Sequence, residues 1–144
     1  MRKFYAGFFC LIALTFFAQG PRPMERIQQG LKTLSVGNWS DAFSQWTRDA
    51  RLPEGMEAEL KQRLDGWMPN TRGIGQWALL RPPLWTSLWQ RHWLVVTFDQ
   101  GALFFNFDHV LHKNTWVLVG LQAGRDPQGV LPHLDHLPME SVKH

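Results

Sequence analysis

The chain has 144 residues, which is enough to form one domain around a single hydrophobic core without help from metals or disulfides. Its 15 Lys and Arg residues against 12 Asp and Glu give a formal net charge of +3. Two of the basic residues, Arg2 and Lys3, stand at the very start of the chain, so that 13 basic residues remain against 12 acidic ones. Because these 13 are scattered rather than clustered in a stripe, we expect no nucleic-acid partner.

The first twenty residues have the features of an export signal. A short basic start is followed by an apolar run from Phe4 to Ala18, which is too short for a comfortable membrane span. We therefore expect residues 1–20 to be a signal peptide or, if uncleaved, an N-terminal anchor, and the protein to be periplasmic or secreted. The single cysteine, Cys10, lies in this segment, so the exported chain would have no disulfide and no thiol nucleophile.

Three amphipathic helices are expected next. Apolar residues at spacings of three and four, such as Ile27, Leu31 and Leu34, place one apolar stripe on each helix. Gly37-Asn38 ends the first helix, Ser40 is expected to cap the second, and Pro69-Asn70 ends the third. The expected helices span residues 24–36, 40–49 and 55–67.

The pattern then changes to strands. Residues 75–81 and 84–90 are expected to form two strands on either side of Pro82-Pro83, because a proline cannot donate a hydrogen bond within a central strand. Residues 91–121 are expected to form three antiparallel strands joined by short turns at Gln100-Gly101 and at residues 111–114.

A two-residue turn at Gln100-Gly101 predicts the strand register. It would place Phe98 opposite Leu103, with His92 opposite His109 and Trp93 opposite Asp108. The third strand would then return with Trp116 beside His109. Both faces of this sheet carry apolar residues, so we expect helices on one face and another segment or a second protomer on the other.

Helices followed by an antiparallel sheet define the α+β class. Within this class, Gly37-Asn38-Trp39-Ser40-Asp41-Ala42-Phe43 and Trp116-Val117-Leu118-Val119-Gly120 resemble the opening helix and the closing tryptophan strand of the NTF2-like, or cystatin-like, superfamily. The chain is especially similar to its small exported bacterial members of unknown function. The resemblance implies that residues 21–123 form three helices packed on a strongly curved sheet, a cone. Residues 124–144 are rich in proline and polar residues, and we expect them to be a flexible tail.

The resemblance implies binding or isomerase and dehydratase chemistry, and the fold does not choose between them. From the residues we expect binding, with two alternatives. The expected binding is without catalysis, either of an apolar small ligand in the cone or of a protein partner through the sheet, which includes a homodimer formed through the sheet face. The first alternative is a small isomerase or dehydratase that uses Asp108 or His109, with His92 nearby. A steroid-isomerase-like site is excluded, because Tyr5 in the export segment is the only tyrosine. The second alternative is an accessory subunit of an envelope or secretion complex.

Tryptophan supplies the candidate binding residues. The chain has eight tryptophans, and indole rings form binding platforms when they are not part of a core. Trp85 and Trp89 are expected to share one strand face after the double proline. No cofactor and no metal site are expected, because the spacing of His109 and His112 falls on a strand end and a turn. The candidates for ligand or partner binding are Trp77, Trp85, Trp89, Trp93, Phe104 and Asn106.

Overall fold

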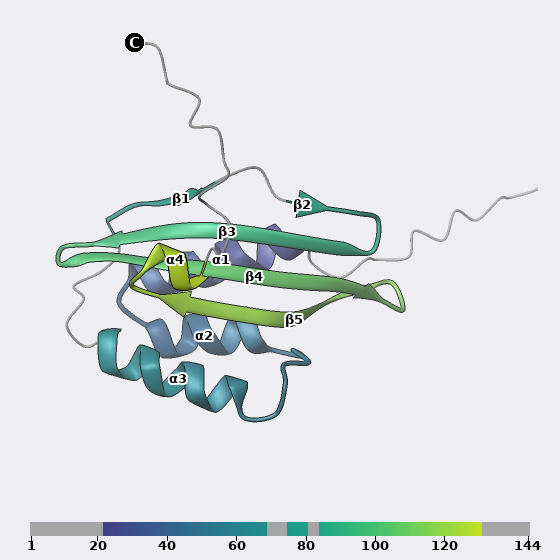
Figure 1. Cartoon of the computed structure of the whole chain (residues 1–144), viewed down its shortest axis with the longest axis horizontal. Helices are drawn as coiled ribbons and strands as arrows, with labels where there is room; N and C mark the ends of the chain where they lie inside the picture. Colours follow the sequence, from purple (N-terminus) through teal and green to yellow (C-terminus); the bar gives the residue numbers. More distant parts are fainter. Residues whose placement is uncertain (1–21, 69–74, 81–83, 131–144) are drawn as a thin grey trace, which may run out of the picture.

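The computed structural model describes residues 22–68, 75–80 and 84–130, and the predicted export segment lies outside them (Figure 1). It confirms an α+β fold in which three helices precede an antiparallel sheet. No helix within the described ranges is long and apolar enough to cross a membrane. The elements are α1 (Pro23–Ser35), α2 (Trp39–Thr47), α3 (Met56–Trp67), β1 (Trp77–Leu79), β2 (Leu84–Trp85), β3 (Trp89–Phe98), β4 (Gly101–His112), β5 (Thr115–Gly124) and α4 (Pro127–Val130).

The three predicted helices are confirmed within one or two residues at each end. Each helix buries the apolar stripe that its sequence predicts, as Ile27 and Leu31 of α1 and Leu64 of α3 illustrate. One detail of the prediction is wrong, because Asn38 rather than Ser40 caps α2. The Asn38 side-chain oxygen accepts a hydrogen bond from the Asp41 amide at 3.1 Å, so the helix begins at Trp39.

The long strands β3, β4 and β5 form the predicted meander. The sheet has the order β1-β3-β4-β5, and β2 pairs with β3 beyond the end of β1. The predicted strands at 75–81 and 84–90 are shorter than expected. β1 ends at Leu79, and β2 ends at Trp85 because Thr86 folds the chain into a tight turn. Its hydroxyl accepts hydrogen bonds from the amides of Leu88 and Trp89, so Trp85 and Trp89 belong to different strands rather than to one strand face.

The predicted register of β3 against β4 is wrong by two residues. The central turn residues are Asp99 and Gln100, so Phe98 pairs with Gly101 instead of Leu103. The positive φ, 139°, occurs at Gly101 just after the turn, where a side chain would be strained. A shift of two residues leaves every side chain on its predicted face while changing its partner.

The turn between β4 and β5 also differs from the prediction. It consists of Lys113 and Asn114, both with positive φ, so His109 pairs with Leu118 instead of Trp116. A register shift follows between Asp108 and His109, and such a bulge bends a strand and increases its twist.

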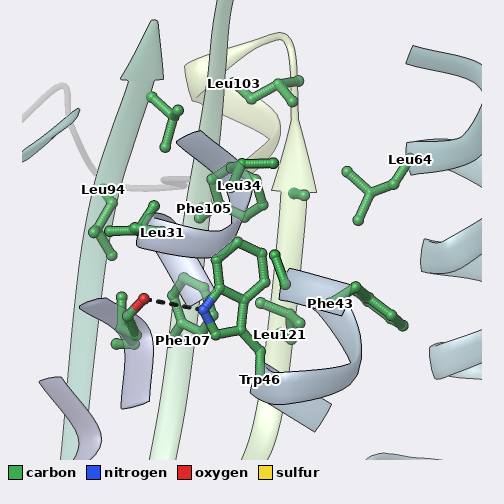
Figure 2. Close-up of a cluster of buried hydrophobic side chains, with 14 of the residues drawn as sticks. Leu31, Leu34, Phe43, Trp46, Leu64, Leu94, Leu103, Phe105, Phe107 and Leu121 are labelled. Atoms are coloured by element: carbon green, nitrogen blue, oxygen red, sulfur yellow. Dashed lines mark hydrogen bonds between the residues drawn. The ribbon is translucent and has the colours of Figure 1, made fainter. Parts of the chain in front are cut away.

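The main core lies between the helices and one face of the sheet. Trp46 of α2 packs edge-on against Phe105 and Phe107, with ring centroids 5.6 and 5.3 Å away (Figure 2). Its indole nitrogen donates a 3.1 Å hydrogen bond to the carbonyl of Ile27, which ties α2 to α1. A hydrogen bond of this kind satisfies the one polar atom of a buried tryptophan.

The opposite face of the sheet, here called the outer face, is covered in part by α4. Val130 of α4 is buried against Trp93, and Leu80 and Phe104 pack around them as a small second core. Figure 1 shows α4 and α1 on opposite sides of the sheet. The first residues of the predicted tail therefore contribute a short helix that packs on the domain.

Candidate functional site

The outer face carries a group of aromatic and charged side chains that extends from the region that α4 covers toward the start of β3. Alternation along β3 puts Trp89, Arg91 and Trp93 on this face, and register puts Asp108 of β4 directly opposite Arg91. We call these four residues the outer-face cluster.

Arg91 lies at the centre of the cluster. Its Nε atom donates to Asp108 Oδ1 at 2.5 Å and its terminal nitrogen donates to Oδ2 at 2.8 Å, which is the two-point geometry that arginine prefers with carboxylates. The guanidinium carbon lies 5.0 Å from the ring centroid of Trp89 and 5.7 Å from that of Trp93. Both distances are within the range of cation–π attraction. The Arg91 guanidinium therefore contacts Asp108, Trp89 and Trp93 at the same time.

Exposure distinguishes the two partners of this ion pair. The Arg91 side chain is 35% exposed and the Asp108 side chain 14% exposed, so the carboxylate is the more buried partner. A glycine makes room for it, because Gly120 pairs with Asp108 and a Cβ at that position would lie 3.1 Å from Asp108 Oδ2. The cluster thus presents Arg91 and Trp89 to solvent, whereas Trp93, which is 5% exposed, and the Asp108 carboxylate are mostly buried.

Asn106 continues the polar surface across the sheet. It pairs with Trp93 on one side and Gln122 on the other, and its amide nitrogen lies 3.5 Å from the Gln122 side-chain oxygen. The Asn106 residue is 6% exposed, and its Oδ1 atom has no hydrogen-bond partner among the described residues. A buried acceptor without a donor costs free energy, so this oxygen destabilises the outer side of the sheet.

The structure separates the predicted binding residues into three groups. Trp89, Trp93 and Asn106 lie together on the outer face, and Phe104 lies on the same face, where it packs with Trp93 in the small core under α4. Trp77 pairs with Val96, which puts it on the opposite face at the sheet edge. Trp85 belongs to β2, and its side chain lies outside the described part of the structure.

Arg91 was missed by the sequence prediction. The signal for it is present in the sequence, since an arginine with a tryptophan two residues before and two residues after it lies between two indoles on any strand. Its carboxylate partner could not be found in the same way, because that required the correct register.

His92 and His109 lie on the other face, inside the main core. They were expected at a half-exposed sheet end, but they are only 2% and 1% exposed because α1 covers this end of the sheet. Their ring centroids are 6.3 Å apart, and the Nδ1 atom of each has no hydrogen-bond partner among the described residues.

Burial determines the protonation state of both histidines. It lowers the pKa of His109 to about 3, and the charge that His92 carries when protonated and the charge of Arg26 act in the same direction. The pKa of His92 is also lowered by burial, against a smaller opposing effect of Asp108. Both rings are therefore neutral near pH 7.

The predicted catalytic residues do not form one site. Asp108 and His109 are consecutive in β4, so their side chains point to opposite faces, and the Asp108 carboxylate is already bound to Arg91. Within the described ranges, no three His, Cys, Asp or Glu side chains are grouped closely enough to hold a metal ion.

Comparison with known proteins identifies no family for this chain. No family model matches the chain, and no curated protein is similar to it in sequence. Among solved structures, a DUF4783 family protein from Bacteroides uniformis is similar with a TM-score of 0.48 and 11% sequence identity, over 67% of this chain and 93% of that protein. This distant likeness assigns no function.

Proposed function

We propose that this chain is an exported domain of the NTF2-like kind, without catalysis of its own, that binds a protein partner through the outer face of its sheet. The observation that carries the proposal is the outer-face cluster, in which Arg91 is held between Trp89, Trp93 and Asp108. Tryptophan and arginine are the residue types that contribute most strongly to protein–protein interfaces.

The geometry of the cluster favours binding because the arginine is already ordered. Fixing a free arginine side chain in a complex costs about 0.5–1.5 kcal/mol of conformational free energy. The two hydrogen bonds to Asp108 and the flanking indoles order this side chain in the free protein. A partner that packs on the cluster would therefore lose little conformational entropy on this side of the interface.

The packing between helices and sheet favours a protein partner over an apolar ligand in the cone. The rings of Trp46, Phe105 and Phe107 contact one another there (Figure 2). Because these rings fill the space where the resemblance implies a pocket, a ligand would have to displace core side chains.

The test compares two tryptophan substitutions in the exported protein. The Trp89→Ala variant removes one indole of the outer-face cluster. The control variant, Trp39→Ala, removes an indole on the helical side of the sheet that also contacts a cation, because Lys61 Nζ lies 5.2 Å from its ring centroid. After cross-linking in intact cells, a partner band should be present in the native protein and in the Trp39→Ala variant. It should fall at least about tenfold in Trp89→Ala, the size of effect expected for a central interface residue.

Three results would change the proposal. Equal cross-linking in Trp39→Ala and Trp89→Ala would exclude the outer face as the interface. A cross-linked product of twice the chain mass that is lost in Trp89→Ala would identify the partner as a second copy. An intact export segment on the cross-linked protein, found by N-terminal sequencing, would instead support a tethered accessory subunit of an envelope complex.

A further inference from the structure

A second surface, at the open edge of β5, has the features of a binding site for an extended peptide. β5 is the last strand of the sheet, so among the described residues only β4 pairs with it as a strand (Figure 1). The far edge of such a strand carries backbone N–H and C=O groups that can pair with another extended chain.

The loop after α2 already uses part of this edge. The Arg51 amide donates a 2.8 Å hydrogen bond to the Leu118 carbonyl, so the β5 edge accepts backbone hydrogen bonds from a neighbouring segment. Further along the same strand, from Leu121 to Ala123, a groove of about 410 Å³ runs between β5 and the two helices α3 and α4.

The floor and walls of this groove differ in character. Leu60, Leu121 and Ala123 are buried apolar residues at its base, and Gly129 and Val130 of α4 form one wall. Leu121 and Ala123 face the helical side, and Gln122 faces the outer side, because side chains alternate along a strand. An added strand would therefore place every second side chain against the apolar base.

The charge on the groove comes from the residues around the start of α3. Glu59 is paired with Arg63 four residues later, so these two charges compensate each other. Glu54 also lines the groove and has no ion-pair partner among the described residues. One uncompensated negative charge next to an apolar base matches a ligand with one basic side chain.

We infer that the groove binds an extended segment of a partner protein, added as a strand to the β5 edge, with an apolar side chain over Leu60 and Leu121 and a basic side chain beside Glu54. Strand addition of this kind takes its affinity from backbone hydrogen bonds and its specificity from pockets for alternate side chains. The apolar and basic residues of the segment must be two positions apart, because they share one face of the added strand.

The probe is the acetylated, amidated peptide Thr-Leu-Thr-Lys-Thr, and the control peptide has glutamate in place of lysine. Titration of the full ¹⁵N-labelled chain should shift the amide resonances of residues 119–124 with the lysine peptide, and the glutamate peptide should bind more weakly. The Glu54→Gln substitution should lower the affinity for the lysine peptide about threefold, which is the usual effect of losing one exposed ion pair. Glu57→Gln, which changes an exposed charge three residues later in α3 and outside the groove, should leave the affinity for the lysine peptide unchanged.

A steric variant supplies a second readout. A Cβ added at Gly129 meets no atom within 4 Å, and Gly129 lines the groove, so Gly129→Leu should fold and narrow the groove. It should abolish the shifts at residues 119–124, while Trp89→Ala, which affects only the outer-face cluster, should preserve them. Gly129→Leu therefore tests peptide binding in the groove, and Trp89→Ala tests partner binding at the outer face, so that either hypothesis can fail without the other.

Two results would overturn the inference. Absence of shifts at residues 119–124 up to millimolar peptide, with native spectra, would exclude strand addition at this edge. Peptide binding that occurs only after removal of residues 131–144 would show that the chain's own C-terminal segment, rather than a partner, occupies the groove.

Discussion

The imidazole rings of His92 and His109 pack edge to face in the main core, with centroids 6.3 Å apart and planes at 85°. Neither ring lies beside a carboxylate on its own face of the sheet, and the positive Arg26 of α1 is close enough to lower the pKa of His109 further. Two adjacent imidazoles without a negative partner can be buried only in their neutral forms. This end of the core is therefore sensitive to acid.

The first prediction is that the domain loses stability between pH 6.5 and pH 3. His109 takes up a proton at its ordinary pKa of 6.5 when unfolded but only at about 3 when folded, so the unfolded state binds more protons in this interval. Stability is complete above pH 6.5 and falls as the pH decreases. Urea denaturation should show a free energy of unfolding about 2 kcal/mol lower at pH 5.0 than at pH 7.5 from His109 alone.

A leucine at position 109 should reduce this dependence on pH, whereas His112→Gln, at an exposed position of the same strand, should not. The His92 ring contributes in the same direction, so part of the dependence should remain in the His109→Leu variant. An unchanged pH dependence in that variant would contradict the assignment.

The second prediction contrasts two helical glycines. A Cβ at Gly30 in α1 would lie 2.0 Å from the Trp46 indole nitrogen, whereas a Cβ at Gly66 in α3 would meet nothing within 4 Å. Gly30→Ala should therefore destabilise the domain by about 1–3 kcal/mol, the usual cost of overpacking a core. Gly66→Ala should stabilise it by about 0.5–1 kcal/mol, because alanine favours a helix.

Thermal unfolding followed by circular dichroism measures both changes, and tryptophan fluorescence reports whether Trp46 has moved. Equal effects of the two substitutions would show that the close contact between α1 and the Trp46 ring is not present in solution.

The third prediction concerns the ion pair at the centre of the outer-face cluster. A double-mutant cycle on Arg91→Ala and Asp108→Ala should give a coupling energy of about 1 kcal/mol, at the upper end for a partly exposed pair. The Glu59–Arg63 pair of α3, four residues apart and well exposed, is the matched control and should couple by about 0.3 kcal/mol. Addition of 1 M NaCl should reduce the coupling of both pairs. Equal coupling in the two cycles would show that the surrounding indoles do not strengthen the Arg91 pair.

The sequence predicted the elements of this fold better than the pairing between them. Apolar stripes at helical spacing located α1, α2 and α3, and the apolar run of residues 91–121 located the meander. By contrast, α4 could not be predicted, since its four residues are too few to show a period and include Pro127 and Gly129, which disfavour helices.

The same limit explains why the outer-face cluster was found only in part. The predicted register placed Asp108 opposite Trp93, and the actual register places it opposite Arg91. The error came from the turn, because the sequence shows that Gly101 tolerates a positive φ but not whether it stands inside the turn or just after it. A register error of two residues leaves each side chain on its correct face of the sheet, but it does not reveal that Arg91 and Asp108 are opposite each other.

The fourth prediction follows from the other turn of the meander. Lys113 and Asn114 have φ values of 47° and 62°, both in the left-handed region that disfavours most side chains. A two-residue turn with two positive φ values is most stable as Asn-Gly. The double substitution Lys113→Asn and Asn114→Gly should therefore stabilise the domain by about 1 kcal/mol, measured by urea denaturation at pH 7.5.

The matched control for this turn is Gly101→Ala in the first hairpin. At a φ of 139°, alanine is strained by about 1–3 kcal/mol, so this substitution should destabilise the domain where the Asn-Gly substitution stabilises it. Opposite signs would show that the two turns have the backbone conformations on which the register depends. If both variants are destabilised, the β4–β5 turn has another conformation in solution, and the pairing of His109 with Leu118 would have to be assigned again.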